Sequence, residues 1–428
     1  MAPPQLPPEI VEDILLRFPP DHPAHVVRAA LVCKHWSRLI AGGDFRRRYR
    51  QRHREAPVLG LVANLADTGG AARFVPTRCA FRPARTERPG YRAHDARHGR
   101  VLLNRMRAPP GQEAAEDSAL AVWDPIADEQ RRLPLLPRPR YVRTWNAAVL
   151  CATAAAACDH LDCHREPFRV VFVGIDAKEM FAHVYSSESA AWSEATTADH
   201  PGDDQLDVAL PGVLARDALY FLLHGRETRI LKCDPATLEM SVVRLLRIHS
   251  YAPRIVLMTM EDGGLGFAQV DLNCTLRLWS MKIRPDGGLG ADGDTREWVI
   301  SRAIDLKAQL FTPRQLPPHA LGFDASPLCV VVAFADGAGV IFLKTNDGLY
   351  SFDLKSDEAV KVDMSSGFYD IIPFMSIYTP VLRVATTGLD SKRKCVTMQT
   401  LIGQQDFREM KDSGTYVQDS ILRPGVGI

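Results

Sequence analysis

The sequence predicts an α+β multidomain protein, in which a small three-helix unit at the N-terminus is followed by an all-β propeller of five to seven blades, with six favoured. Helical periodicity is confined to the first 54 residues, and short strand-like runs fill residues 57–380. Within these runs one sequence pattern, an apolar run followed by an Asp or Ser turn and a second apolar run, recurs at intervals of blade length. We divide the chain into residues 1–54, 55–380 and 381–428. We expect the last part to be a mobile polar tail.

Composition and length are those of an ordinary globular protein. The chain has 428 residues, of which 46% are hydrophobic and 24% charged. No run of 18 apolar residues occurs, and the N-terminus has neither the basic nor the apolar segment of a secretory signal. We therefore expect no membrane span and a cytoplasmic or nuclear location. The nine scattered cysteines are expected to be mostly reduced, buried thiols.

The first predicted helix begins near Pro7 and Pro8, which suit a helix start, and acidic residues in its first turns favour the helix dipole. At 100° per residue, one arc of about 140° collects a buried stripe of Ile10, Val11, Ile14, Leu15 and Phe18. Leu16 falls on the polar side instead, where an apolar residue gains nothing unless something covers it. We therefore expect Leu16 to contact a partner.

Two more helices are predicted in AHVVRAALVC and KHWSRLIAGG, after the proline cluster that ends the first helix. In the third helix one face collects Cys33, Trp36, Leu39 and Ile40. A unit of about 50 residues buries little surface, so a partner or the next domain is expected to complete its core.

The β region is predicted from apolar runs such as FRVVFVGID, ALYFLLH and CVVVAF, which alternate with Gly, Asp and Pro turns. An apolar run, an Asp or Ser turn and a second run recur around Asp124, Ser186, Asp234, Ser280 and Asp353. Their spacings of 62, 48, 46 and 73 residues fit four-stranded blades with insertions. Five blades are visible, and residues 57–107 are a candidate for a sixth.

Residues 6–49 resemble an F-box, through the opening Leu-Pro, the I-x-x-x-I-L spacing, and L-V-C-K-x-W-x-x-L-I followed by Asp-Phe. The resemblance departs from the usual pattern mainly in the loop FPPDHPAHVV. It implies an adaptor-binding region that contains Leu6, Pro7, Ile10, Ile14, Leu16, Leu31, Val32, Cys33, Trp36, Leu39, Ile40 and Phe45. Some of these residues must instead form the small core.

Together with the F-box, the repeated phrases resemble the F-box-associated β-propeller of plant F-box proteins of the grass type. This resemblance implies the substrate receptor of an SCF-type (Skp, cullin, F-box) ubiquitin ligase. The F-box would bind the Skp adaptor, and through it the cullin and RING subunits, while the propeller holds an unknown target protein. Such a receptor supplies proximity and needs no catalytic residue. Loops after Met281 and around Asp199 to Asp207 are candidates for target binding.

Charge is distributed unevenly, because residues 1–107 hold 20 Lys and Arg against 9 Asp and Glu. The run FRRRYRQRHRE concentrates this charge and could bind nucleic acid. We favour the solvated side of a short helix or a contact with an acidic protein, because no aromatic RNA signature or zinc-finger spacing accompanies the run.

Motifs for catalysis are absent from the sequence, which has no G-x-S-x-G, H-E-x-x-H, Walker loop or strand-linked G-x-G-x-x-G. We therefore expect neither enzyme activity nor a cofactor. The segment CDHLDCH places Cys158, His160, Cys163 and His164 within seven residues, which could suit zinc. A blade-connecting loop without metal is favoured, because the two histidines would compete with Cys163 at one ion.

Two other functions stay open. The propeller could be an enzyme or a carbohydrate- or ligand-binding protein with an appended helical module, since fold does not fix function. Alternatively, the F-box could be non-functional and the protein a scaffold. A deep channel lined by histidines and carboxylates would favour the ligand-binding alternative, and a broad loop face would favour the receptor.

Overall fold

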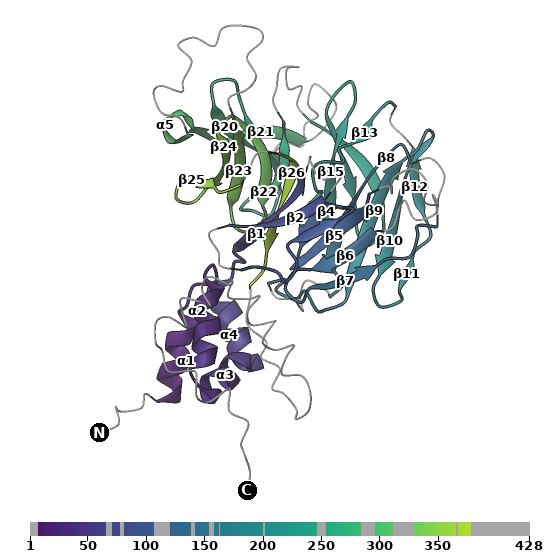
Figure 1. The fold of residues 1–428 in the computed structure, drawn as a ribbon. Helices are drawn as coiled ribbons and strands as arrows, with labels where there is room; N and C mark the ends of the chain where they lie inside the picture. Colours follow the sequence, from purple (N-terminus) through teal and green to yellow (C-terminus); the bar gives the residue numbers. More distant parts are fainter. Residues whose placement is uncertain are drawn as a thin grey trace, which may run out of the picture.

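The computed structural model describes residues 7–65, 71–77, 81–106, 120–137, 142–153, 158–161, 163–199, 202–245, 254–283, 296–310, 329–364 and 367–377. A cluster of short helices lies beneath a β-propeller (Figure 1). The expected tail, residues 381–428, lies outside the described residues. None of the helices described has both the length and the apolar character needed to cross a membrane.

The helical unit contains the three predicted helices and a fourth in the Arg-rich run. Its helices are α1 (Pro8–Leu16), α2 (Pro23–Val32), α3 (Lys34–Ala41) and α4 (Gly43–His53). Pro7 caps α1 and Pro8 opens it, as the sequence predicts. Arg54, which caps the C-terminus of α4, has a left-handed backbone with φ of 46° and turns the chain toward the propeller.

Six sheets form the propeller blades, which confirms the favoured blade count. The first two blades contain β26 (Phe368–Met375), β1 (Val58–Leu65), β2 (Ala71–Pro76) and β3 (Glu87–Pro89), then β4 (Tyr91–Arg97), β5 (Arg100–Arg105), β6 (Leu120–Asp124) and β7 (Glu129–Arg132). The candidate sixth blade in residues 57–107 thus supplies three strands of blade one and two strands of blade two.

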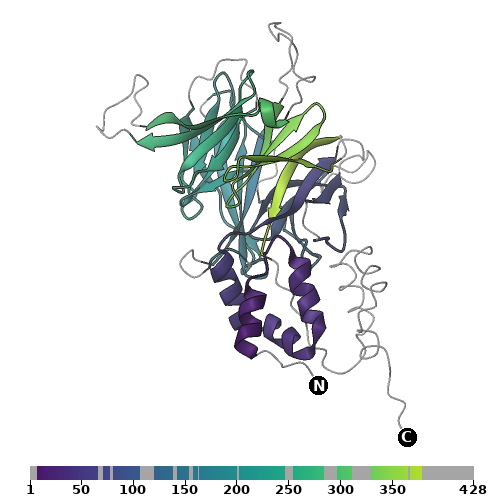
Figure 2. The same cartoon turned by 90° about the vertical axis from the view of Figure 1, so that its left-hand side faces the viewer.

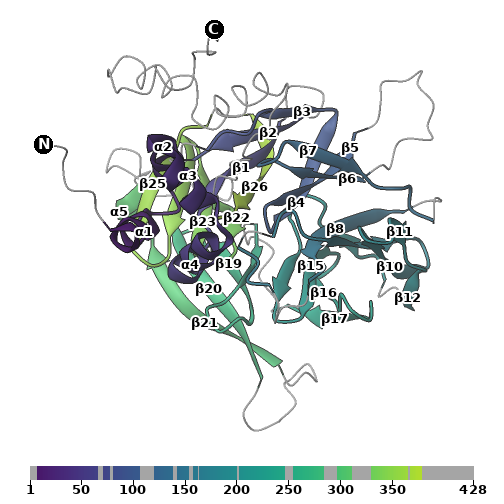
Figure 3. The ribbon, with the colours of Figure 1, turned by 90° about the horizontal axis from the view of Figure 1, so that it is seen from below.

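The remaining blades follow one another around the ring in chain order (Figure 3). Blade three contains β8 (Thr144–Cys151), β9 (Phe168–Ile175), β10 (Glu179–Ser186), β11 (Ala191–Trp192) and β12 (Thr196–Asp199), and blade four contains β13 (Gln205–Leu206), β14 (Val213–Ala215), β15 (Ala218–His224), β16 (Arg229–Cys233) and β17 (Met240–Arg244). Blade five contains β18 (Val256–Thr259), β19 (Leu265–Val270), β20 (Thr275–Ile283) and β21 (Arg296–Asp305), the short helix α5 (Lys307–Leu310) follows, and blade six contains β22 (Cys329–Ala335), β23 (Val340–Thr345), β24 (Gly348–Asp353) and β25 (Glu358–Val362).

The ring is closed by pairing between the last and first strands of the propeller. β26 lies antiparallel to β1, with Ile372 opposite Val62 and Pro373 opposite Leu61. Blade one therefore takes its inner strand from the C-terminal end of the propeller and its other strands from the N-terminal end. This pairing holds both ends of the ring in one sheet.

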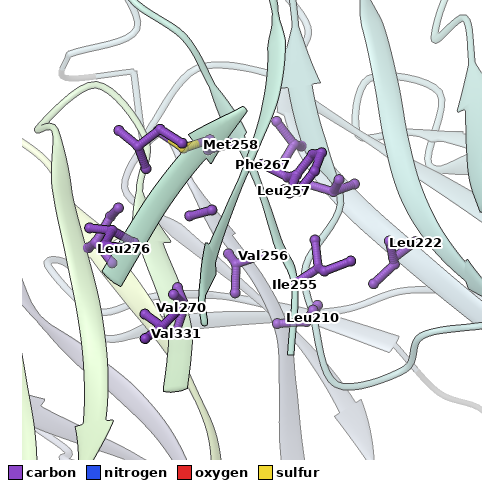
Figure 4. Packing of buried hydrophobic residues seen from close by; sticks show 14 of the residues in the cluster. Leu210, Leu222, Ile255, Val256, Leu257, Met258, Phe267, Val270, Leu276 and Val331 are labelled. Atoms are coloured by element: carbon purple, nitrogen blue, oxygen red, sulfur yellow. The ribbon is translucent and has the colours of Figure 1, made fainter. Parts of the chain in front are cut away.

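Buried apolar side chains fill the spaces between neighbouring blades. Around blade five, Phe267 and Leu276 belong to one buried cluster with Leu222 of blade four and Val331 of blade six (Figure 4). Each blade thus buries its faces against its neighbours, as expected for a repeat architecture.

The helical unit packs directly on the propeller (Figure 2). Val27 of α2 lies in the same buried cluster as Leu59, Phe74 and Phe374 of blade one. In return Ile377, just after β26, is fully buried in the core of the helical unit. The small core is therefore completed by the next domain, as its size predicts.

The predicted orientation of the first helix is wrong. Leu16 is buried in the core of the helical unit, whereas Ile10 and Ile14 of the expected buried stripe are exposed. Val11, Leu15 and Leu16 form the side of α1 that faces α2 and α4. The helix is rotated relative to the prediction because its apolar residues surround more than half of it, and packing decides which side is covered.

Candidate functional site

The adaptor-binding residues implied by the F-box resemblance fall into three groups in the structure. Leu6 lies outside the described residues. Exposed or half-buried positions are Pro7, Ile10, Ile14, Val32 and Cys33, followed by Leu31, Trp36 and Leu39. Buried positions, which cannot contact a partner in this conformation, are Leu16, Ile40 and Phe45. The resemblance therefore mixes core residues with surface residues.

Three large apolar side chains of the helical unit are exposed to water. The exposed fractions are 48% for Ile10, 43% for Ile14 and 62% for Val32. Ile10 and Ile14 are four residues apart on α1 and so share a face of that helix. Exposed apolar side chains so close in sequence are typical of a surface that another protein covers.

The Arg-rich run forms α4 and pairs largely with acidic groups of the same chain. Arg48 Nη1 lies 2.7 Å from Glu12 Oε1 of α1, and Arg47 Nη2 lies 2.9 Å from Asp44 Oδ1. Arg50 Nε donates to Asp159 Oδ2 of the propeller over 2.9 Å. These contacts agree with the solvated-helix interpretation and leave less of the charge for nucleic acid.

A cavity of about 280 Å³ lies in the central channel, at the end next to the helical unit. The inner strands of the blades line it together with residues 54–56, which link α4 to β1. Its ionisable groups include Asp95, Arg97, His98 and Asp336. The structure therefore has a channel with a histidine and carboxylates, the feature that the ligand-binding alternative requires.

The polar side chains that line this cavity mainly form hydrogen bonds and ion pairs with other groups of the protein. Asp95 Oδ2 accepts a hydrogen bond of 2.9 Å from Val149 N, and Arg97 Nη1 lies 3.7 Å from the same oxygen. Arg97 also donates to the carbonyl oxygen of Gly212. Burial raises the pKa of Asp95 and of Asp336, and Arg97 opposes both shifts. These contacts tie the inner strands of blades two, three and four together.

The CDHLDCH segment lies in the connection between β8 and β9, on the side of the helical unit. His164 does not join the other three candidate ligands, because its Nδ1 lies 2.6 Å from Asp124 Oδ2 inside the propeller. Cys151, the last residue of β8, takes its place beside Cys158, His160 and Cys163. Cys151 lies outside the compact CDHLDCH segment and is therefore not among the ligands predicted from the sequence, although it precedes Cys158 by only seven residues.

Two thiols of this cluster, those of Cys151 and Cys163, are buried, and that of Cys158 is half-buried. Burial raises the pKa of the Cys163 and Cys158 thiols, and burial lowers the pKa of His98, which contacts the cluster, to about 3. All seven cysteines in the described part of the chain are free, and Cys79 and Cys395 lie outside it. Without a cation both thiols and the imidazole of His98 are neutral near pH 7.

Among solved structures the chain is similar to the complex of fission yeast SREBP-SCAP binding domains, with 12% identity and a TM-score of 0.32 over 64% of this chain and 61% of that one. It thus spans less than two thirds of that structure. It is also similar to AztD of Citrobacter koseri, with 10% identity and a TM-score of 0.33 over 73% of this chain and 89% of that one. No curated protein matches the chain.

Two protein families match the sequence itself. Residues 4–52 match the F-box-like family, which coincides with the helical unit. Residues 92–382 match the family described as F-box protein AT5G49610-like, beta-propeller, which covers blades two to six and the closing strand β26. Since the second match alone spans more than half of the chain and both agree with the observed domains, the chain belongs to the F-box proteins with an AT5G49610-like β-propeller.

Proposed function

We propose that this protein is a substrate receptor of an SCF-type ubiquitin ligase. The observation that carries the proposal is the exposed apolar face of α1, formed by Ile10 and Ile14, on an F-box unit anchored to a propeller. This surface binds the Skp adaptor, which connects the chain to the cullin and RING subunits. Of the residues implied by the resemblance, the exposed ones form the contact and the buried ones form the core.

The propeller has the role of holding the target protein. Loops at the ends of strands from several blades lie together on one face, so their sequence can vary without disturbing the core. The segment of Asp199 to Asp207, which runs from the end of β12 through β13, is one candidate. The loop after Met281 falls in residues 284–295, outside the described residues. The receptor itself is non-catalytic, raises the local concentration of target lysines, and acts in the cytoplasm or nucleus.

Adaptor binding is tested with the double variant Ile10→Asp/Ile14→Asp. Because both side chains are exposed, their replacement leaves the core intact but places charge in an apolar contact. We expect binding to the purified Skp adaptor to weaken at least about tenfold, with an unchanged melting temperature. Leu272→Asp is the control, since Leu272 of the propeller is also a large apolar side chain exposed to water. Wild-type adaptor binding by the double variant would refute the proposed surface.

Target binding is tested by affinity purification with the proteasome blocked. A target should copurify with the full chain and with the Ile10→Asp/Ile14→Asp variant, because that variant changes only the F-box surface. Its ubiquitination should require the wild-type F-box. A propeller partner whose ubiquitination is the same with both chains would contradict the receptor function.

Ligand binding in the central channel is a second candidate, favoured by the cavity of about 280 Å³ with Asp95, His98 and Asp336 in its lining. The internal contacts of Asp95 and Arg97 make it the weaker candidate. A panel of neutral and cationic sugars is the probe. Under this alternative, one of them raises the melting temperature of the wild-type chain but not that of Asp336→Asn.

A further inference from the structure

Four side chains at one edge of the propeller converge on a single point. Cys151, Cys158, His160 and Cys163 each offer one ligand atom, and these atoms all lie within 4.8 Å of one another. Cys151 Sγ lies 4.0 Å from Cys158 Sγ, and Cys163 Sγ lies 3.9 Å from His160 Nδ1. All four ligands belong to the described part of the chain, and they come from the end of β8 and the connection that follows it.

We propose that these four residues bind one Zn²⁺ ion in a closed, structural site. With Zn–S bonds of about 2.3 Å and a Zn–N bond of about 2.0 Å, tetrahedral ligands lie about 3.5 to 3.8 Å apart. The distances of 4.0 and 3.9 Å therefore need a contraction of about 0.2 to 0.4 Å, and every other pair, all within 4.8 Å, one of about 1 Å or less. A disulfide between Cys151 and Cys158 would need the two sulfurs at about 2.05 Å, far closer than they lie.

The donor set and its surroundings suit zinc. Three thiolates and one imidazole are a ligand set of structural zinc sites and leave no open position for catalysis. The backbone N–H of His160 donates to Cys158 Sγ at 3.4 Å, and the His98 ring stacks on the His160 ring with 4.4 Å between centroids. His98 Nδ1 accepts from Cys151 N at 3.1 Å, and Arg100 Nη2 donates to Cys163 O at 2.6 Å. These contacts hold Cys151, at the end of β8, and Cys163, in the connection that follows, against His98 and Arg100 of blade two.

The site also lies where the F-box joins the propeller. Two residues between the ligands contact the F-box: Asp159 pairs with Arg50 of α4 at 2.9 Å, and Leu161 packs on the core of the helical unit. Leu161 O accepts a hydrogen bond of 2.9 Å from Ile377 N. A metal that fixes Cys158, His160 and Cys163 therefore fixes the loop that holds the F-box in place. Binding releases the three thiol protons to solvent.

Zinc content of the full chain is the first test. We expect about one zinc per chain by elemental analysis after purification without chelator, and a loss of most of it in Cys158→Ser and in Cys163→Ser. Cys233→Ser is the matched control, because Cys233 is also a buried thiol but lies in blade four. Wild-type protein that holds no zinc and takes up none on titration would overturn the proposal, as would equal zinc content in all four proteins.

Ligand substitutions separate coordination from folding. His160→Cys keeps a soft donor and should retain zinc, whereas His160→Asn should lose most of the affinity. Cobalt-loaded wild-type protein should show the visible absorption of tetrahedral thiolate coordination, a measurement that needs no substitution.

Chelation should also speed proteolysis between Arg54 and Pro57, where the F-box joins the propeller, and should not do so in Cys158→Ser. Equal zinc affinity of the two His160 variants would remove His160 from the site. These measurements do not involve the adaptor, so the metal site and the proposed function fail independently.

Discussion

At the scale of single residues, His94 is a buried histidine that weakens the fold in acid. Its ring lies 4.4 Å from that of Trp145, and neither ring nitrogen has a hydrogen-bond partner in the described part of the chain. Burial lowers the pKa of His94 to about 3, and the positive charge of Arg92 adds to this shift. The folded state therefore keeps His94 neutral at pH values where the unfolded chain takes up a proton.

The direction of the pH effect follows from the pKa of His94 in the folded state and its pKa in the unfolded state. Because the unfolded pKa is about 6.5, His94 lowers the free energy of unfolding as the pH falls from about 6.5 toward about 3, by up to about 1.4 kcal/mol per pH unit. We expect His94→Phe to stabilise the protein by about 1 kcal/mol at about pH 7.5, and by more at about pH 5. Urea unfolding at both pH values measures this difference.

The same replacement at an exposed position is the control for His94→Phe. His22 is exposed on the surface of the helical unit, so His22→Phe should leave the pH dependence of the free energy of unfolding unchanged. If His94→Phe unfolds with the wild-type dependence on pH, the acid sensitivity of the propeller has another source.

Predictions for single residues succeeded where the effect of a residue depends on its own backbone, and failed where tertiary packing determines which residues are buried. Pro7 and Pro8 start α1 as predicted, because their effect depends only on their own backbone. Leu16 was assigned to the wrong face, because periodicity shows which residues are apolar but not which are covered. Cys151 was missed as a ligand because only the folded β8–β9 connection brings it to Cys158.

At the scale of elements, the aspartate turns predicted from the repeated phrase are present and have a clear physical basis. Asp124 Oδ1 accepts hydrogen bonds from Ile126 N and Ala127 N, and Asp234 Oδ1 accepts from Ala236 N and Thr237 N. Ser280 is the exception, because it lies within β20 rather than at a turn. Strands and turns could be predicted because both depend on short-range patterns, whereas the pairing of β26 with β1 spans the whole ring and leaves no local signal.

The turn after β24 offers a test of how much these aspartates contribute. Asp353 Oδ1 accepts from Lys355 N at 2.7 Å and from Ser356 N at 3.2 Å. We expect Asp353→Ala to lower the free energy of unfolding by about 0.5 to 1.5 kcal/mol, because it removes this acceptor. Asp353→Asn keeps an acceptor oxygen and should cost less. Equal losses in urea unfolding of the two variants would show that charge, not the hydrogen bonds, matters here.

At the scale of the whole molecule, Ile377 connects the two domains. It is fully buried in the core of the helical unit although it follows the last propeller strand. We expect Ile377→Ala to cost about 2 to 5 kcal/mol in the F-box alone, since the cavity opens there and not between blades. Thermal unfolding should then show an early F-box transition before that of the propeller. Ile300→Ala, at an exposed position, is the control, and a single shifted transition would mean that the domains unfold as one unit.

The closed ring predicts which fragments of the chain fold. Residues 55–380 contain both partners of the closure, β1 and β26, so this fragment should be β-rich by circular dichroism and unfold cooperatively. Its melting temperature should lie below that of the full chain, because removal of α2 takes Val27 and Leu31 from the apolar cluster of blade one. The F-box alone, residues 1–54, should be unfolded, since it lacks Ile377.

Two shorter fragments test whether closure of the ring is what lets the propeller fold cooperatively. A fragment of residues 55–364 lacks β26, and one of residues 108–380 lacks β1 to β5, so each leaves the ring open and exposes buried strand faces to water. We expect both to aggregate or to lose cooperative unfolding, although 55–364 is only 16 residues shorter than the closed fragment. Cooperative urea unfolding of 55–364 at the midpoint of 55–380 would contradict this prediction, because it would mean that each blade is stable without closure and that β26 serves only to hold Ile377 in the F-box.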